Sequence, residues 1–173
     1  MASLSPSFPT SRELQAQPRL KRNSPLAPSP SSILFFCRRH NIAIAAASRT
    51  SAPSAAKQAL NGLYLVDDSP RRHSDAPAAM KAWNLFNFDE IYPGSKITHF
   101  RKLHADSSFA YEDMIFFDDE YRNSEVGTKL GVHFVEVGHQ GLDLGTFEKG
   151  VAEWRARRAA RSGSEDADIA SKV

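Results

Sequence analysis

Two adjacent carboxylates, Asp118 and Asp119, follow a short apolar run at residues 114–117. Such a run predicts a buried strand of a parallel sheet, and ligands of these sheets bind beyond the carboxyl ends of the strands. Two carboxylates there repel each other unless a cation or a proton lies between them. Mg²⁺ fits this placement because it prefers one or two carboxylates together with water and phosphate oxygens. The pair alone is equally compatible with a solvated acidic turn before the next helix.

A hydroxyl and a guanidinium follow a second predicted strand, at residues 42–47. Ser48 and Arg49 come directly after this run of small residues, and Pro53 lies in the first turn of the next predicted helix. Backbone N–H groups at a helix start, the helix dipole and an arginine together form a typical phosphate site. The alternative is that Ser48 and Thr50 are only helix caps.

Lys96 lies in the first turn of a third predicted helix, after a Pro93-Gly94 turn and the N-cap residue Ser95. A cation at this position opposes the helix dipole, but it becomes favourable when an anion is bound there. Lys96 is therefore the third polar group at a strand-to-helix junction.

The elements that would position these residues alternate along the chain. We expect helices and strands in turn, with helices at residues 33–39, 79–86, 96–103 and 123–130 and strands at 42–47, 114–117 and 132–137. A final helix is expected to carry Phe147, Val151 and Trp154 on one face. This alternation predicts an α/β fold in which helices flank a parallel sheet as three layers.

The length of 173 residues suits one domain. Residues 1–32 contain eight serines and six prolines, which predicts a disordered leader. We expect the folded domain at residues 33–160, with the charged, proline-bearing segment 67–79 as an exposed insertion. Residues 161–173 are predicted to be a disordered tail.

The charge is unevenly distributed: residues 1–66 contain a single acid, Glu13, although the net charge is only +2. A serine-rich, acid-poor, basic leader is typical of an organelle transit peptide; a plain disordered tail or a wrongly assigned first exon explains it equally well. Otherwise we expect a cytoplasmic monomer. The sequence predicts no membrane span, no zinc site and no nucleic-acid binding, and its single cysteine forms no internal disulfide.

Residues 41–158 resemble the eukaryotic magnesium-dependent phosphatases of the haloacid dehalogenase (HAD) superfamily, most closely the fungal members. Four motifs carry the resemblance: Ala47-Ser48-Arg49-Thr50, Glu90-Ile91-Tyr92-Pro93-Gly94-Ser95-Lys96, Phe116-Phe117-Asp118-Asp119-Glu120 with Arg122-Asn123, and Gly150-Val151-Ala152-Glu153-Trp154-Arg155. Together they are far more specific than any one alone.

The resemblance implies a HAD-like, Rossmann-like fold and a hydrolase that acts on phosphomonoesters or phosphotyrosine. It implies that Ser48 and Arg49 hold the phosphoryl group of a phosphorylated small molecule or phosphoprotein. Lys96 would neutralise the phosphoryl group and the nucleophile, and Asp118 with Asp119 would bind Mg²⁺. These roles decide between the two interpretations of the acidic pair in favour of the metal.

The resemblance also implies a first strand ending in Asp-x-Asp-x-Thr, whose first aspartate forms an aspartyl-phosphate and whose second is the general acid and base. No aspartate precedes Asp67 in this chain. The nucleophile and the central strand that carries it are therefore expected to be missing, and the sheet is expected to be incomplete at that strand.

Three hypotheses follow. The protein is an active phosphatase whose amino-terminal exon is misassigned, or the chain as written is a non-catalytic remnant that binds phosphate and Mg²⁺. A receiver-like phosphoacceptor domain is rejected, because its lysine should follow the acidic pair and Lys96 precedes it.

Overall fold

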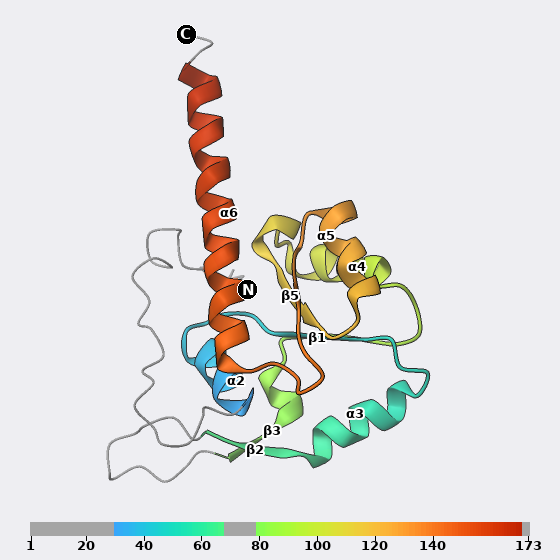
Figure 1. The fold of residues 1–173 in the computed structure, drawn as a ribbon. Coiled ribbons are helices and arrows are strands. Elements are labelled where there is room, and N and C mark those ends of the chain that lie inside the picture. Colours follow the sequence, from blue (N-terminus) through green and yellow to red (C-terminus); the bar gives the residue numbers. More distant parts are fainter. Residues whose placement is uncertain (1–29, 68–78, 171–173) are drawn as a thin grey trace, which may run out of the picture.

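The structure is a computed structural model that describes residues 30–67 and 79–170, with only the backbone described for residues 162–170. Its first half contains α2 (Pro30–Arg39), β1 (Ala45–Ser48), α3 (Pro53–Gly62), β2 (Tyr64–Val66), β3 (Ala79–Lys81), the 3-10 helix η1 (Ala82–Leu85) and β4 (Phe88–Ile91). The second half contains α4 (Lys96–Ser107), η2 (Tyr111–Asp113), β5 (Ile115–Asp118), η3 (Tyr121–Ser124), α5 (Glu125–Leu130), β6 (His133–Glu136) and α6 (Leu144–Ala170) (Figure 1). The predicted α/β class is confirmed.

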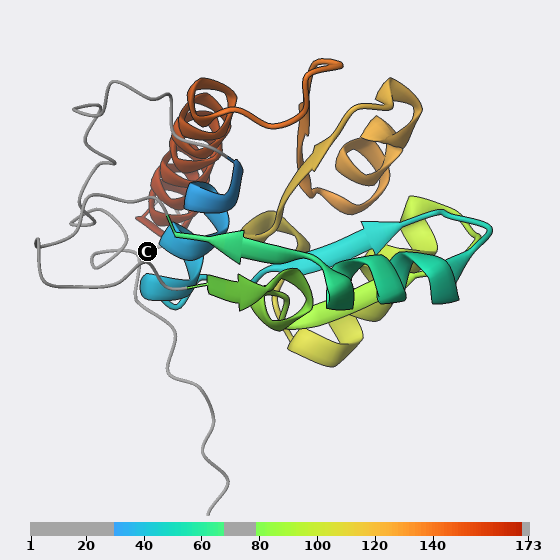
Figure 2. The same ribbon diagram turned by 90° about the horizontal axis from the view of Figure 1, so that it is seen from below.

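The described strands form three two-stranded sheets and do not join into one. β1 pairs with β4 in parallel, and β5 pairs with β6 in parallel, with Ser48 opposite Ile91 and Asp118 opposite Glu136. β2 and β3 form an antiparallel pair, which Figure 2 shows beside α3. The expectation of a sheet that is incomplete at its centre therefore agrees with two separate parallel pairs.

The hydrogen bonds of β1 show which of its edges is unpaired. The carbonyl groups of Ile44 and Ser48 accept hydrogen bonds from the backbone N–H groups of Phe88 and Tyr92, at 3.3 and 3.1 Å. Alternate residues of a parallel strand face opposite neighbours, so the carbonyl of Ala47 faces away from β4. Among the described residues, no strand pairs with that edge.

β5 has the same arrangement. The carbonyl groups of Met114 and Asp118 accept from the backbone N–H groups of His133 and Val137, both at 3.0 Å. Phe117 therefore directs its backbone polar groups to the other edge of β5, and no described strand pairs with it there. Each parallel pair thus keeps one edge without a strand partner.

The main core cluster is built by α4, β5 and α5. Phe100, Phe116 and Val126 form its centre with Val132, and the rings of Phe100 and Phe116 meet edge to face with centroids 4.8 Å apart. Phe100 and Leu103 are therefore on the face of α4 that is buried. Gly131 has φ 91° and ends α5, as its position after the helix predicted.

A second cluster joins α2 to α6. Ile33 and Cys37 of α2 pack with Leu144, and Phe147 lies against the same cluster. Figure 1 shows α2 beside the base of α6, whose far end extends well beyond the rest of the protein. No helix among the described residues is long and apolar enough to cross a bilayer.

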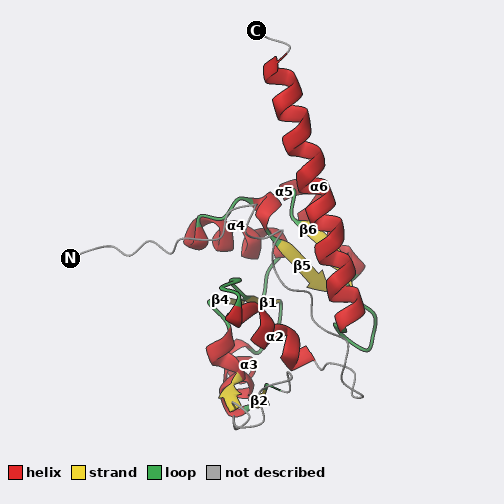
Figure 3. Ribbon diagram, turned by 90° about the vertical axis from the view of Figure 1, so that its left-hand side faces the viewer, coloured by secondary structure: helices red, strands yellow, loops and turns green. Residues whose placement is uncertain are grey.

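α4 lies between the two parallel pairs. It packs on β1 and β4 as well as on α5. In Figure 3, α4, α5, β5, β6 and α6 lie together in the upper part of the view, with β1, β4, α2 and α3 below. A residue at the start of α4 can therefore contact strands of both pairs.

Several boundaries differ from the sequence prediction; β1, for example, spans Ala45–Ser48 and not residues 42–47. Helix α2 begins at Pro30 and buries Ser32, so the predicted leader 1–32 overlaps it, and residues 1–29 lie outside the described residues. The predicted helix 79–86 is instead strand β3 followed by η1, because Ala79–Lys81 pairs with β2. In the predicted tail 161–173, residues 161–170 are helical as part of α6. Within the predicted insertion 67–79, residues 68–78 lie outside the described part of the chain.

Gly150 allows α6 to lie close against the β5–β6 pair. A Cβ atom at this position would be 2.9 Å from Phe117 Cε1 and 2.9 Å from Val135 Cγ2. Both neighbours are side chains of strands, and Phe117 already packs against Phe147 with ring centroids 5.7 Å apart. Any larger residue at position 150 must therefore move α6 or the two strands.

We predict that Gly150→Ala lowers the free energy of unfolding by about 1–3 kcal/mol, the usual cost of overpacking, although alanine favours the helix by about 1 kcal/mol. Urea denaturation followed by circular dichroism measures the change. Gly62→Ala at the end of α3 is the control, because no atom lies within 4 Å of its added methyl group. Equal stabilities of the two variants would contradict the close packing of α6.

Candidate phosphate and metal site

The predicted site residues come together at the carboxyl ends of β1 and β5. Ser48 and Asp118 are the last residues of these two strands, and Lys96 is the first residue of α4. α4 begins there because Ser95 is its N-cap: the Ser95 hydroxyl accepts a hydrogen bond from the backbone N–H of Thr98 at 3.2 Å. The strand ends and the helix start therefore bring Ser48, Lys96 and Asp118 to one edge of the protein.

Lys96 is buried, with 4% of its surface exposed. Its ammonium group lies 3.2 Å from Asp118 Oδ2 and donates a hydrogen bond to the carbonyl of Ala47. It also lies over the ring of Phe116, 4.9 Å from the ring centre. A buried cation is tolerated only when it is paired and hydrogen-bonded, and Lys96 obtains these partners from β1 and β5 together.

Asp118 is held at both of its carboxylate oxygens. Oδ1 accepts hydrogen bonds from the backbone N–H of Glu120 and from Asn123 Nδ2, both at 2.8 Å. Oδ2 faces Lys96. The bond to the N–H two residues ahead is an Asx-turn, so the local sequence itself fixes the orientation of this side chain.

Asn123 connects Asp118 to Arg49. Its side chain amide donates to Asp118, and its Oδ1 accepts a hydrogen bond from Arg49 Nη1 at 3.1 Å. Only 1% of Asn123 is exposed. The contacts thus run from Ala47 through Lys96, Asp118 and Asn123 to Arg49. Because Arg49 is only two residues after Ala47, these contacts form a polar ring that joins β1 to β5.

Glu120 and Arg122 form the outer part of the site. The Arg122 guanidinium, hydrogen-bonded to Glu120 at 2.6 and 3.0 Å, lowers the pKa of Glu120, and Asn123 and Arg49 lower it further. Arg49 Nη1 lies 3.9 Å from Glu120 Oε2. The carboxylate of Glu120 is therefore charged and holds both arginines at the rim.

Ser48 and Asp119 are less constrained than the ring. The Ser48 hydroxyl accepts a weak hydrogen bond from the backbone N–H of Thr50 at 3.4 Å. It does not cap α3, whose N-cap is Ala52 without a side-chain hydrogen bond. Asp119 is exposed, and no hydrogen bond or ion pair within residues 30–67 and 79–170 engages its carboxylate. Both side chains are thus available to a ligand.

Sequence reasoning did not assign a role to Asn123 or Glu120, although both stand in the motif that carries the resemblance. Asn123 is the residue that joins the two strand ends, and its near-complete burial was not visible in a polar turn sequence. The available signal was the spacing Asp118 to Glu120, which is typical of an Asx-turn and indicates that the aspartate is fixed by its own loop.

The donor set fits Mg²⁺ in part. Asp118 and Asp119 supply two hard carboxylate donors, which is the number that Mg²⁺ commonly takes from a protein, with water and phosphate completing its octahedron. No group of three or more His, Cys, Asp or Glu side chains in the described part of the chain forms a ready metal cage. The residues therefore suit an ion that is shared with a phosphate ligand better than a structural zinc or calcium ion.

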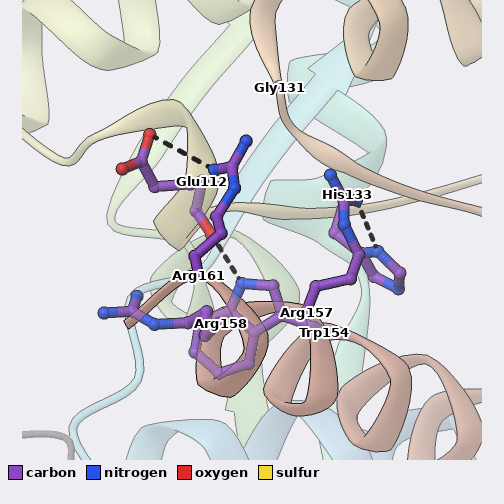
Figure 4. Close-up of a pocket in the computed structure, with 7 residues that line it drawn as sticks. All are labelled: Glu112, Gly131, His133, Trp154, Arg157, Arg158 and Arg161. Atoms are coloured by element: carbon purple, nitrogen blue, oxygen red, sulfur yellow. Dashed lines mark hydrogen bonds and ion pairs between the residues drawn. The ribbon is translucent and has the colours of Figure 1, made fainter. Parts of the chain in front are cut away.

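A second polar cluster lies at the amino end of the β5–β6 pair, away from these residues. Figure 4 shows this shallow pocket, lined by Glu112, Gly131, His133, Trp154, Arg157, Arg158 and Arg161. Trp154 Nε1 donates to the Glu112 carbonyl at 2.7 Å, Arg157 Nη1 donates to His133 Nδ1 at 3.0 Å, and Arg158 pairs with Asp113. These contacts attach α6 to η2 and β6.

Three findings relate the chain to known proteins. A family model described as Acid Phosphatase matches residues 3–157. A HAD-like hydrolase superfamily protein of Schizosaccharomyces pombe is 40% identical over 118 residues, which are 68% of this chain and 63% of that protein. Magnesium-dependent phosphatase 1 of Homo sapiens is 33% identical over 146 residues, which are 84% of this chain and 73% of that protein. The match thus spans less than two thirds of the fission yeast protein.

Removing the Lys96 ammonium should destabilise the protein strongly. Lys96→Met leaves Asp118, whose side chain is 11% exposed, without its cation, and the expected loss is about 3 kcal/mol of unfolding free energy. Lys57→Met is the control, because it breaks an exposed ion pair: the side chains of Lys57 and Asp89 are 43% and 32% exposed. This change should cost less than about 1 kcal/mol of unfolding free energy. Guanidinium denaturation compares the two; equal small losses would contradict the buried pair.

Stability should fall as the pH is lowered from 7.5 to 5.5. Burial lowers the pKa of His99 and of His133 below the usual value of about 6.5, and the charges of Lys96 and Arg157 lower them further. As the pH falls towards and below about 6.5, the unfolded chain binds protons that the native histidines do not bind. The unfolding free energy therefore decreases, by at most about 1.4 kcal/mol per pH unit for each histidine. Denaturation at several pH values measures the slope, and a His99→Gln/His133→Gln variant should flatten it. An unchanged slope in that variant would contradict the assignment.

Proposed function

Because the chain belongs to the acid phosphatase family, and with it to the magnesium-dependent phosphatases of the HAD type, we propose that residues 47–123 form a site for a phosphomonoester and Mg²⁺. The observation that carries the proposal is the Lys96 ammonium, buried 3.2 Å from Asp118 Oδ2 at the junction of β1 and β5. A buried lysine at a helix start is costly unless it serves an anion.

We assign the phosphoryl group to Ser48, Arg49 and Lys96. The Ser48 hydroxyl is a hydrogen-bond donor at the strand end, and Arg49 can present a guanidinium fork that matches phosphate oxygens. Lys96 adds a compact positive charge and the start of α4 adds its dipole. Asn123 holds Arg49 at 3.1 Å and thus orients it before a ligand arrives.

Asp118 and Asp119 are the proposed Mg²⁺ ligands. Bound Mg²⁺ would neutralise phosphoryl oxygens as a Lewis acid. Asp118 is already oriented by the Glu120 N–H and by Asn123, both at 2.8 Å from Oδ1. Asp119 is exposed and free to turn towards the ion.

Turnover requires a nucleophile that this group of residues does not contain. The resemblance implies an aspartate that attacks phosphorus, whereas residues 1–66 hold only one carboxylate, Glu13, outside the described residues. We therefore propose that the chain as written binds its ligands without hydrolysing them, and that hydrolysis depends on a carboxylate supplied by a sequence that differs from residues 1–66.

A non-catalytic binding protein is the second candidate function. The closed polar ring favours it, because Lys96 satisfies the outward carbonyl of Ala47 without any central strand. The two candidates share the same ligands and differ only in turnover. An in-frame Asp-x-Asp segment in the transcript upstream of the codon for Ile33 favours the enzyme, and its absence favours the binding protein.

We expect the ligand to be a phosphorylated small molecule or a phosphoprotein, and the protein to be a cytoplasmic monomer.

Cys37 is a free cysteine that is buried in the α2–α6 cluster. Burial raises the pKa of its thiol to about 11, so it is unreactive, which agrees with a structural role in a reducing compartment.

We predict that Mg²⁺ and a phosphate mimic such as tungstate bind together and that each strengthens the other. The positive metal offsets repulsion between the carboxylates and the anion, so the two affinities are linked. With the nucleophile carboxylate missing, the Mg²⁺ dissociation constant should be no better than millimolar, roughly −4 kcal/mol. Calorimetric titration with each ligand, alone and with the other present, measures the coupling.

Two variants separate the two halves of the site. Lys96→Ala should weaken tungstate binding more than Mg²⁺ binding, and Asp119→Asn should do the reverse. An aryl phosphate with Mg²⁺ should show no turnover above background. Independent binding of the two ligands would refute the common site, and Mg²⁺-dependent turnover that disappears in Asp118→Asn would refute the missing nucleophile.

A further inference from the structure

We propose that His99 is a positioning residue for the phosphate site: it fixes the turn at residues 92–95 and thereby sets the positions of Lys96 and Ser48. Neither the motifs nor the family relationship assigns it a role. The inference rests on the proposed function where it concerns the anion, whereas the contacts that carry it are independent of any ligand.

The imidazole of His99 is completely buried, with 0% of the residue exposed. Its Nε2 lies 3.1 Å from the carbonyl oxygen of Tyr92, and the two rings meet edge to face with centroids 4.3 Å apart at 89°. A carbonyl oxygen only accepts hydrogen bonds, so Nε2 carries the proton and donates it to Tyr92. One side chain of α4 thus holds both the backbone and the ring of Tyr92.

Tyr92 connects His99 to β1. Its carbonyl accepts from His99, while its backbone N–H donates to the carbonyl of Ser48 at 3.1 Å. The turn also lies directly on the imidazole, because a Cβ atom at Gly94 would be 3.7 Å from Nε2. The end of β1 and the start of α4 are therefore joined by two hydrogen bonds that share one residue, Tyr92.

Lys96 lies one helical turn before His99 on α4. The backbone N–H of His99 donates to the carbonyl of Ser95, at 3.2 Å, within the capping turn that precedes Lys96. Because the turn cannot shift without breaking the bond to His99, the Lys96 Cα has a fixed place relative to Ser48. Two of the three residues assigned to the phosphoryl group, Ser48 and Lys96, therefore share one support.

The remaining ring nitrogen argues against a role as simple core filling. His99 Nδ1 is buried without a hydrogen-bond partner among the described residues, and an apolar side chain would avoid that cost, as Phe100 and Leu103 do on the same helix. What an aliphatic residue lacks is the donor to Tyr92. Burial and the nearby Lys96 charge also lower the pKa of His99, so the ring stays neutral.

The test compares His99→Leu, which fills the space but has no donor, with His99→Gln, whose amide N–H can replace the Nε2 donor. Each full-length variant is titrated with tungstate at a fixed Mg²⁺ concentration and, separately, with Mg²⁺ alone. Loss of one hydrogen bond predicts about fivefold weaker tungstate binding for His99→Leu, the equivalent of about 1 kcal/mol. Mg²⁺ affinity should change less than twofold, and His99→Gln should restore tungstate binding.

Leu103→Ala is the matched control, because it weakens the packing of the same helix in the main core without contacting the turn. It should lower stability while leaving tungstate affinity unchanged. Amide hydrogen exchange of Tyr92 gives a readout that needs no ligand, and it should accelerate in His99→Leu by about the same factor as the loss of affinity, but not in His99→Gln.

Equal tungstate affinity in His99→Leu and the wild type would overturn the inference. It would also be overturned if Leu103→Ala weakened tungstate binding in proportion to its loss of stability. If the wild type binds no tungstate, the proposed function fails instead, and exchange at the Tyr92 amide alone decides whether His99 fixes the turn. Slow exchange in His99→Leu would then overturn the inference.

Discussion

The position of the Lys96 ammonium is the constraint on which the rest of the site depends. The Ala47 carbonyl faces the edge of β1 that no described strand covers, and a buried carbonyl must find a donor. Lys96 supplies that donor and pairs with Asp118 at the end of β5. One side chain thus takes over part of the role of a strand between the two parallel pairs, which explains why the start of α4 must be placed so exactly by its capping turn.

The need to hold the two parallel pairs together also explains the arrangement of the flanking helices. α4 packs on β1 and β4 and on α5, so it cannot follow one parallel pair without moving the other. α6 adds a second connection, because Gly150 lies on the β5–β6 pair while Leu144 packs with α2. With no continuous sheet among the described strands, helices and side chains hold the two pairs together.

The sequence predicted several elements because each has a local cause, but it did not predict β2 and β4. Ser95 at the N-cap and Gly131 after α5 mark helix ends, and the apolar runs before Ser48 and Asp118 are strands. The segment 79–86 was wrongly predicted as a helix, because pairing of Ala79–Lys81 with β2 outweighs local propensity. The role of Asn123 depends on a contact with Arg49 across 74 residues, and no local pattern contains that information.

If the site binds the ligands proposed above, Lys96 also couples the stability of the protein to ligand binding. Its ammonium already contacts Asp118 and Ala47, so an arriving phosphoryl group competes with the contacts that hold β1 and β5 together. Asp118 can release Lys96 at low cost only if another positive charge or a proton compensates its carboxylate. An anion alone is therefore opposed by the structure, whereas an anion that arrives with a cation leaves every charge paired. In the proposed function, the need for two ligands at this edge follows from the burial of one lysine.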